Sequence, residues 1–382
     1  MKLDTQYSFC PICKSKKISF IKNQNINAIR SDGMIIKEEF KKHHCHNCCF
    51  MWSNNFNSWQ ETRYLRSDGT SPFELERNSK VANGLAKIIS KEVEAKGNIS
   101  ILEIGAGSFC TSEKLAELFP KSSIMAIERS PEKKPSQHHD NLTCIEADLE
   151  NIELDKFDVV FSNMVLEHQE NPEKFLLDCK SKLNETGIII TIVPNADIVT
   201  HEVLFHDHYS HFTSSSIMHL ADKCNLQLLT VDKAGWDHEA LVFILSKRKS
   251  NSNKVYFAKN RLDCTLFSER ENLISSWSKY EAISLQKRRI LEKELYLFGA
   301  GEYTQLVKCF LPNLYKHANG LIVTNKSGVR SFDKPIYCLS EIIDKTNTII
   351  LIGAKKSSRP VIKQKLANAK FLEENILDFE YI

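Results

Sequence analysis

Ile99-Ser100-Ile101-Leu102-Glu103-Ile104-Gly105-Ala106-Gly107-Ser108 is the stretch that decides the fold. Its mostly apolar first part predicts a short strand over Ile99 to Ile104, and Thr111 to Leu118 predicts a helix after the two glycines. Glycine lets the backbone approach a ligand closely, and the first turn of a helix offers unpaired N–H groups. This order is typical of a nucleotide-binding turn, but an ordinary structural turn explains two glycines equally well.

Polar residues follow the next three predicted strands where each strand ends. The strands and the residues that follow them are Ser123 to Ile127 with Glu128, Leu142 to Glu146 with Ala147-Asp148-Leu149, and Phe157 to Ser162 with Asn163. Ligands of an open parallel sheet bind at the carboxyl ends of its strands, where an acid such as Glu128 meets ribose hydroxyls. Asp148 stands where a carboxylate could accept from an adenine amino group. Each acid alone could be a solvated strand end or a cap, but the set favours a cofactor site.

The segments that follow continue the alternation of helices and strands. Asn171-Pro172-Glu173 predicts a helix start with a capping residue and a proline at the first helical position, so its role is mainly structural. Gly187 to Val193 predicts a fifth strand. The fold class is therefore α/β, with a Rossmann-like sheet.

This series resembles the class I S-adenosylmethionine (SAM)-dependent methyltransferase family over residues 99–248. The resemblance implies that Gly105 and Gly107 border the methionine part of the cofactor, that Glu128 holds the ribose and that Asp148 holds the adenine. The residues expected to bind SAM are Glu103, Gly105, Gly107, Glu128, Asp148, Leu149 and Asn163. Hydride transfer is disfavoured, because Cys110 stands in place of the third glycine of a dinucleotide turn.

Two Cys-x-x-Cys pairs near the N-terminus predict a structural Zn²⁺ site with four ligands, Cys10, Cys13, Cys45 and Cys48. Ile18 to Ile21 and Met34 to Phe40 are expected to form a hairpin between the pairs, giving a zinc ribbon. Free or redox-active thiols are the alternative, and substitute ligands are available in His44, His46 and Cys49. Four protein ligands leave no position for water, so this zinc should support folding.

The segment His201-Glu202-Val203-Leu204-Phe205-His206-Asp207-His208-Tyr209-Ser210-His211-Phe212 holds four histidines and two acids. Methyl transfer needs a base that takes a proton from the acceptor, and we expect His208 to be that base with Asp207 as its supporting acid. His168, just after the fourth strand, is the second candidate. A metal site is the alternative, and some of these histidines could only brace the helix that begins near Ser214.

The order of segments also resembles the three-domain sugar C-methyltransferases. That resemblance implies residues 1–65 as a zinc-ribbon module, 66–248 as the methyltransferase domain, 249–292 as a helical linker and 293–382 as a smaller C-terminal Rossmann-like domain. Phe205-His206-Asp207-His208 looks related to the Tyr-His-Glu-His segment of those enzymes. Because Phe replaces the phenol and Asp replaces the Glu, transfer to oxygen or nitrogen stays open beside transfer to carbon.

The C-terminal part has its own glycine turn, Gly299-Ala300-Gly301, after a predicted strand over Glu294 to Phe298. Thr304 stands in place of a third glycine, so a tight structural turn and a nucleotide site are both open. Further strands are predicted at Gly320 to Val323 and Thr348 to Ile352. This domain is expected either to hold the nucleotide of the substrate or to close the active-site cleft.

Composition limits the partners. The chain has 382 residues and a formal charge of +3, which is small for a dedicated nucleic-acid binder. We found no apolar stretch long enough to cross a bilayer and no signal-peptide pattern, which predicts a cytoplasmic protein. The weak charge favours a small-molecule substrate, and we expect a sugar or nucleotide sugar. The alternatives are an RNA methyltransferase, for which Lys14 to Lys17 and Lys41-Lys42 could form a basic patch, and a non-catalytic SAM-binding scaffold. The oligomeric state cannot be derived from the sequence.

Overall fold

The structure is a computed structural model that describes residues 8–22, 27–54, 72–93, 97–130, 138–233, 239–247, 264–286, 292–326, 329, 332–354 and 358–378. The chain forms two compact units. The first comprises Met1–Ile21, Lys41–Val203 and His208–Arg270, and the second comprises Lys22–Phe40, Leu204–Asp207 and Glu271–Ile382. Each unit is described below by itself.

These units do not follow the four consecutive segments expected from the sequence. The two cysteine pairs belong to the first unit, whereas residues 22–40, which lie between the pairs, belong to the second. The expected boundaries at 65/66 and 248/249 lie outside the described residues. The division into four segments therefore stays a prediction.

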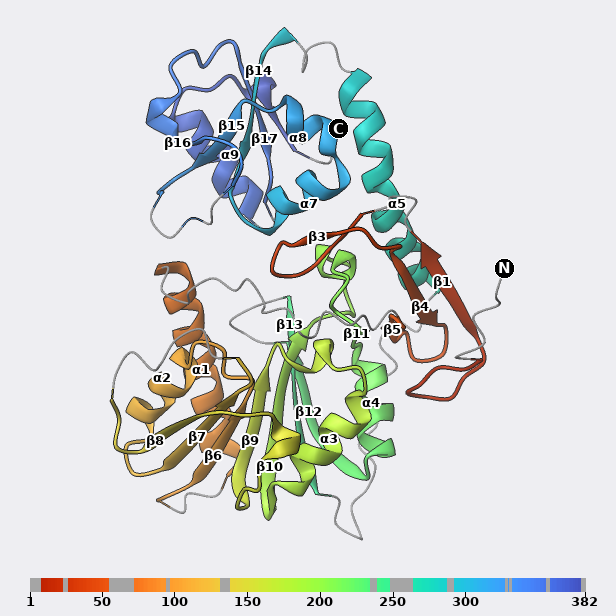
Figure 1. Ribbon diagram of the computed structural model, residues 1–382, viewed down its shortest axis with the longest axis vertical. Helices are drawn as coiled ribbons and strands as arrows, with labels where there is room; N and C mark the ends of the chain where they lie inside the picture. The colour runs from red at the N-terminus through yellow and green to blue at the C-terminus, as the bar shows by residue number, and fades with distance from the viewer. Residues whose placement is uncertain are drawn as a thin grey trace. The chain divides into compact units, whose positions relative to one another are not determined.

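A seven-stranded sheet forms the centre of the first unit, in the order β12-β13-β10-β9-β6-β7-β8 (Figure 1). Its strands are β6 (Ser100–Ile104), β7 (Ser123–Glu128), β8 (Leu142–Glu146), β9 (Phe157–Asn163), β10 (Leu183–Pro194), β12 (Leu226–Lys233) and β13 (Ala240–Lys247). Strands β8, β7, β6, β9 and β10 pair in parallel, and β13 pairs antiparallel with both β10 and β12. The predicted α/β Rossmann-like class is confirmed for this unit, including the five strands expected between residues 99 and 193.

Helices cover both faces of this sheet. They are α1 (Pro72–Glu92), α2 (Cys110–Leu118), α3 (Pro172–Ser181) and α4 (Ser214–Lys223), with short 3-10 turns η2 (Leu149–Asn151), η3 (Leu166–His168) and η4 (His201–Leu204). One buried cluster joins α1 and α2 to alternate residues of the strands, and another joins α3 and α4 to the residues between them. Asn171 caps α3 by accepting from the Lys174 N–H at 3.0 Å, as predicted.

A four-stranded sheet in the same unit has the order β1-β4-β5-β11. Its strands are β1 (Ile18–Lys22), β4 (Lys41–Cys45), β5 (Met51–Trp52) and β11 (Ser210–His211). The expected hairpin of Ile18 to Ile21 with Met34 to Phe40 is wrong, because β1 lies beside β4. Residues 27–36 instead form a separate short hairpin of β2 (Ala28–Ile29) and β3 (Ile35–Ile36). The sequence correctly predicted β1 as a strand. Its partner β4 belongs to a sheet that also contains β5 and β11, which the sequence did not indicate.

The second unit contains a five-stranded parallel sheet in the order β16-β15-β14-β17-β18. Its strands are β14 (Glu294–Phe298), β15 (Gly320–Val323), β16 (Ile336–Cys338), β17 (Thr348–Ile352) and β18 (Ile376–Leu377). The helices and 3-10 turns are α7 (Glu302–Phe310), α8 (Pro312–His317), η5 (Leu339–Glu341), α9 (Arg359–Asn368) and η7 (Glu373–Asn375), and α5 (Cys264–Gln286) has residues in both units. The strands predicted at 294–298, 320–323 and 348–352 are confirmed.

Among the helices in the described part of the chain, none is both long and apolar enough to span a membrane.

The core of the second unit can be tested with two isoleucines of very different burial. Ile350 in β17 is 0% exposed, whereas Ile343 is 95% exposed. We expect Ile350→Ala to lower the free energy of unfolding of this unit by about 2–5 kcal/mol, because it removes buried methyl groups and leaves a cavity. The matched variant Ile343→Ala should change it by less than about 0.5 kcal/mol. Denaturant titration measures both, and equal losses would contradict the assignment of this core.

Candidate functional site

The glycine turn after β6 is fixed to the end of the neighbouring strand β7. The N–H groups of Gly105 and Ala106 donate to the Ile127 carbonyl at 2.9 and 3.1 Å. The Gly107 N–H donates to Oε2 of Glu128 at 2.8 Å, and the Ser130 N–H lies 3.2 Å from its Oε1. Gly105 and Gly107 both have positive φ, 73° and 58°, which glycine adopts without steric cost. The structure thus joins the predicted glycines and the predicted ribose acid in one turn.

Glu103 lies just before this turn and is buried. Its carboxylate accepts from the Ser112 hydroxyl at the start of α2. Burial, more than any other cause, raises the pKa of Glu103 to about 8, and the nearby Glu128 carboxylate acts in the same direction. Glu103 therefore braces β6 against α2 from inside the protein.

The other predicted cofactor residues lie at the ends of β8 and β9. Asp148 forms an ion pair with Arg129, which follows β7, and Leu149 begins η2 and packs against the core. Oδ1 of Asn163 is buried and has no hydrogen-bond partner among the described residues. Such an atom is costly unless a water or ligand supplies a donor, so its chemistry fits a polar cofactor at this strand end.

Val165 connects the glycine turn to the histidines. A Cβ placed on Gly105 would lie 2.5 Å from Cγ2 of Val165, so the Gly105 backbone and the Val165 side chain approach as closely as glycine permits. Val165 directly precedes η3, which carries His168. The ring of His168 packs edge-on against that of His208, with centroids 4.8 Å apart. The predicted cofactor turn and both predicted catalytic histidines therefore belong to one contiguous site.

The acid that faces His208 is Glu202. Nδ1 of His208 lies 3.2 Å from Oε2 of Glu202, and His201 lies 3.8 Å from the other oxygen of the same carboxylate. Asp207, the expected supporting acid, accepts instead from the N–H and the hydroxyl of Ser31 at 2.8 and 2.7 Å. The pairing of His208 with Asp207 is corrected to a pairing with Glu202, because adjacent residues 207 and 208 send their side chains in different directions.

His211 and Lys42 complete this cluster. Nζ of Lys42 lies 2.6 Å from Nε2 of His211 and donates to the His208 carbonyl at 2.9 Å. Lys42 is 1% exposed, so it is no part of the surface patch that the sequence suggested for Lys41-Lys42. The pKa of His211 is held well below its usual value, first by burial and then by the Lys42 charge.

The alternative of a metal at the histidines has a geometric basis. One ligand atom each from Glu167, His168 and His208 lies within 4.8 Å of the others. His208 already faces the Glu202 carboxylate, however, and an imidazole oriented by an acid also suits proton transfer. The acid–base interpretation stays our prediction.

The four predicted zinc ligands form a compact cluster. Sγ atoms of Cys10 and Cys48 lie 3.8 Å apart, those of Cys13 and Cys45 lie 3.5 Å apart, and all four lie within 4.8 Å of one another. Zinc–sulfur bonds of ~2.3 Å would put the sulfur atoms of a tetrahedral site about 3.8 Å apart, so the cluster fits Zn²⁺. All four cysteines are free thiols.

The two cysteine turns have the same local structure. In each, the residue after the second cysteine has positive φ, 60° for Lys14 and 56° for Cys49. Each of these residues donates its N–H to the carbonyl of the first cysteine, at 3.0 and 2.9 Å. Asn47 adds a side-chain bond to Sγ of Cys13 at 3.5 Å. This repetition brings the thiols of each pair to one side, as a closed metal site requires.

Sequence reasoning missed several residues of this site. Glu202 stood in the histidine segment and could have been weighed as the supporting acid. Val165 and the buried Arg270 carried no signal, because an apolar residue after a strand and an arginine in a charged helix are both common. Arg270 donates to Nδ1 of His44 and to the carbonyls of Cys49 and Ala196, at 2.9, 2.8 and 2.7 Å.

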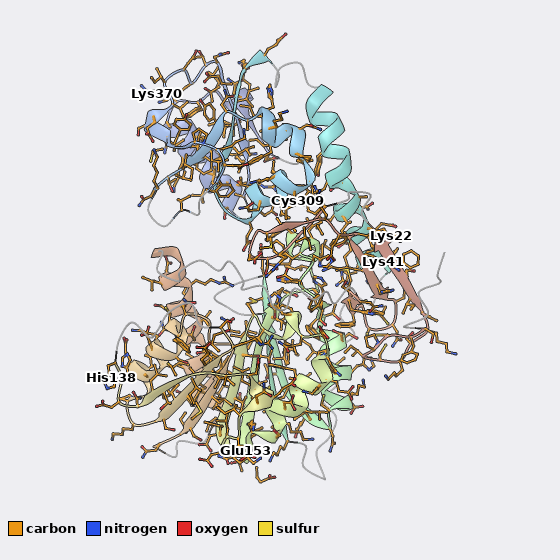
Figure 2. The ribbon with its side chains drawn as sticks, in the orientation of Figure 1. Lys22, Lys41, His138, Glu153, Cys309 and Lys370 are labelled. Atoms are coloured by element: carbon orange, nitrogen blue, oxygen red, sulfur yellow. The ribbon has the colours of Figure 1, made fainter. Side chains whose placement is uncertain are left out.

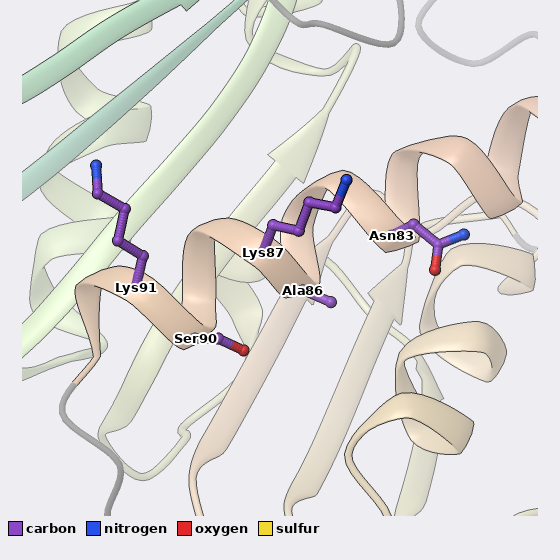
Figure 3. Close-up of a pocket in the computed structure, with 5 residues that line it drawn as sticks. All are labelled: Asn83, Ala86, Lys87, Ser90 and Lys91. Atoms are coloured by element: carbon purple, nitrogen blue, oxygen red, sulfur yellow. The ribbon is translucent and has the colours of Figure 1, made fainter.

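The depression shown in Figure 3 is separate from these residues. Its lining comes from one helix, α1, and consists of Asn83, Ala86, Lys87, Ser90 and Lys91. None of them is a predicted cofactor, zinc or catalytic residue, so it is no part of the candidate site.

Residues 75–231 match the family model described as "Methyltransferase domain". Residues 75–231 therefore form a methyltransferase domain. Among its relatives, the malonyl-[acyl-carrier protein] O-methyltransferase of Bacillus cereus is 29% identical over 116 residues, 29% of this chain and 43% of the relative. That of Bacillus cytotoxicus is 31% identical and also covers 29% of this chain and 41% of the relative. The chain thus spans less than half the length of these curated relatives.

Among solved structures, the chain is similar to methyltransferases at low identity and low TM-score. The plantazolicin methyltransferase in complex with SAH is 15% identical with a TM-score of 0.39, covering 50% of this chain and 93% of that chain. The mitomycin 7-O-methyltransferase is 15% identical with a TM-score of 0.41, covering 51% and 62%.

The close approach at Gly105 predicts a sharp effect of one methyl group. Gly105→Ala should weaken binding of S-adenosylhomocysteine at least about tenfold, because the added Cβ meets Val165 and displaces the turn. Gly97→Ala is the matched control, since Gly97 has nearly the same φ, +70°, but nothing within 4 Å of the added Cβ. Calorimetric titration compares them, and equal affinity of the two variants would contradict a cofactor role for the turn.

Glu103 predicts a pH dependence of stability. Its folded-state pKa of about 8 exceeds its ordinary value of 4.5, so the folded state holds a proton that the unfolded state releases between these pH values. Stability from this group is complete below about pH 4.5 and falls as pH rises toward 8, by up to about 1.4 kcal/mol per pH unit. Glu103→Gln should flatten this slope in urea titrations at pH 5 to 8, whereas Glu146→Gln, at the exposed end of β8, should keep it. A slope that survives Glu103→Gln would refute the assignment.

Proposed function

We propose that the whole chain is a SAM-dependent methyltransferase for a small-molecule acceptor. The observation that carries this proposal is the contact between Gly105 and Val165, which joins the turn of the methyltransferase domain to the segment bearing His168. A protein that only bound the cofactor would need the turn but not the half-buried His168 and the buried His208 packed beside it. Gly105, Gly107 and Glu128 would hold the cofactor, with Asp148, Leu149 and Asn163 at the neighbouring strand ends.

The proposed division of labour follows from the chemistry. When bound, SAM supplies an activated methyl group on a sulfonium. The protein has to align the attacking atom of the acceptor and remove its proton. His208 would take that proton, while Glu202, 3.2 Å from Nδ1, would fix the ring and stabilise its protonated form. His168, packed against His208, would orient the acceptor or share the proton.

We propose a sugar or nucleotide sugar as the acceptor. The support is the order of segments, with a cysteine-cluster module before the methyltransferase domain and a Rossmann-like sheet after it. Phe205 offers no phenol, which favours transfer to oxygen or nitrogen over transfer to carbon. The relatives are named for methyl transfer to malonyl-acyl-carrier protein, so a carboxylate on a carrier is the second acceptor class to test. A cytoplasmic location forms part of this proposal.

We further propose that the cysteine cluster binds one structural Zn²⁺. Its four thiols fit a closed tetrahedral site and leave no open position for chemistry. Removing the metal should therefore destabilise the fold.

The cofactor and metal can be tested on one sample. We expect micromolar binding of SAM and S-adenosylhomocysteine in calorimetric titration and about one zinc per chain in a metal assay. Cys13→Ser should lower the zinc content and the unfolding temperature, whereas Cys338→Ser, at a half-buried cysteine of the second unit, should leave the zinc content unchanged. Binding of neither cofactor form would overturn the methyltransferase proposal.

The base is tested by substitution. With an acceptor found among nucleoside diphosphate sugars or acyl carriers, His208→Ala should lower turnover by about 10²–10⁴-fold while affinity for S-adenosylhomocysteine stays within about threefold. His219→Ala, at an exposed position of α4, is the matched control and should retain turnover. Unchanged turnover in His208→Ala would exclude that residue as the base. Methylation of RNA with salt-dependent retention would instead favour the RNA alternative.

A further inference from the structure

Lys42 is a buried lysine that bonds to two residues of the histidine segment. It belongs to β4, three residues before the zinc ligand Cys45, and is 1% exposed. Its ammonium donates to the His208 carbonyl at 2.9 Å and lies 2.6 Å from Nε2 of His211. A buried charged group is costly unless it is hydrogen-bonded, so the bonds to His208 and His211 offset the cost of burying the Lys42 ammonium.

The chemistry of this contact fixes the state of His211. An ammonium group can only donate, so Nε2 of His211 must accept and its ring must be neutral. Burial and the Lys42 charge both hold the pKa of His211 well below its usual range, in agreement with that tautomer. Lys42 thus binds the backbone at one end of the segment 208–211 and the side chain at the other.

The same segment is bound at further points to the zinc module, which consists of β1, β4 and β5 with the four clustered cysteines. Strand β11 pairs with β5, with Ser210 opposite Trp52 and His211 opposite Met51. The Ser53 N–H donates to the Tyr209 carbonyl at 2.9 Å. The Thr213 hydroxyl donates to the carbonyl of the zinc ligand Cys48 at 2.7 Å. Strand β11 (Ser210–His211) therefore completes the sheet that β1, β4 and β5 begin.

A second buried cation lies on the same module. Arg270 is 0% exposed, and it donates to neutral groups, the His44 ring and the carbonyls of Cys49 and Ala196. Four thiolates around Zn²⁺ carry a net negative charge, which would compensate buried cations nearby. The metal, the cations and the histidine segment would thus depend on one another electrostatically.

We propose that Lys42 is a positioning residue for His208, and that the zinc module is thereby part of the active site and sets the position of the base. Lys42 acts through the His208 backbone and the His211 ring and does not touch the reacting atoms. This inference rests on the proposed function, because His208 needs a fixed position only if it accepts a proton. It gives the zinc module a role in chemistry beyond its support of folding.

The experiment follows the imidazole nitrogens by NMR in full-length, zinc-loaded protein with ¹⁵N-labelled histidine, saturated with S-adenosylhomocysteine. His208→Gln and His211→Gln assign the two rings. The variants are Lys42→Met, the conservative Lys42→Arg, and Lys41→Met as the matched control. Lys41 precedes Lys42 on β4, and its ammonium lies over the exposed ring of Phe20 at 5.5 Å (Figure 2). Zinc content and S-adenosylhomocysteine affinity are measured for every variant.

We expect Lys42→Met to shift the ring signals of both His208 and His211 beyond the difference between wild type and Lys41→Met. Zinc content should stay at one per chain and S-adenosylhomocysteine affinity within about threefold. Lys42→Arg should restore the His208 signal, because it keeps a charged donor. A folded, zinc-loaded Lys42→Met protein with unchanged ring signals would overturn the proposal, since a purely structural lysine would affect only stability.

A second variant covers a failure of Lys42→Met to fold. Lys42→Gln keeps an N–H donor for the His208 carbonyl but removes the charge, so it should shift the His211 signal and leave His208 near its wild-type value. An unchanged His211 signal in Lys42→Gln would equally overturn the proposal. None of these readouts requires methyl transfer. If the protein binds S-adenosylhomocysteine but methylates no acceptor, the proposed function fails, and the ring signals still decide whether Lys42 positions His208.

Discussion

The parallel register of β6 with β7 and β9 is the constraint on which the candidate site depends. Ile104, the last residue of β6, lies opposite Ile127 on one side and Ser162 on the other, so all three strands end at one edge. Gly105, Glu128 and Asn163 lie at this edge, and the Glu128 carboxylate accepts from the Gly107 N–H of the glycine turn. A shift of one residue in this register would turn every side chain to the other face and separate the Glu128 carboxylate from the Gly107 N–H.

Buried charge is the second organising feature of the first unit. Lys42 and Arg270 are both buried, and both bond to backbone carbonyls and to histidine rings. Because an uncompensated buried charge is expensive, these bonds specify one arrangement of β4, β11 and α5 with little tolerance for alternatives. The same bonds keep His44 and His211 neutral, since burial and a neighbouring cation lower the pKa of His44 to about 3 and that of His211 well below normal.

The two glycine turns of the chain differ in what they do. In the second unit, Gly299 has a φ of 117°, and a Cβ added there would lie 2.7 Å from the Gly353 carbonyl oxygen. The Thr304 hydroxyl donates to the Gly299 carbonyl at 2.8 Å, so this turn satisfies its own polar groups. Close packing of two strand ends explains its glycine. In the first unit, the Glu128 carboxylate from the adjacent strand accepts from the Gly107 N–H, which brings together two residues of the proposed cofactor site.

The sequence by itself determined the five parallel strands of the first sheet, three strands of the second, the glycine turn with Glu128 after the next strand, and the four clustered cysteines. These features depend on local periodicity and on spacing along the chain. It placed the hairpin of the N-terminal module wrongly and gave His208 the wrong acid. Only the tertiary structure decided that β11 completes the β1-β4-β5 sheet, that Glu202 and not Asp207 faces His208, and that Lys42 is buried. These contacts join residues that are far apart in sequence. They also depend on the direction that each side chain takes when two elements pack together, which differs even between neighbours such as 207 and 208 and is not predicted by any local sequence pattern.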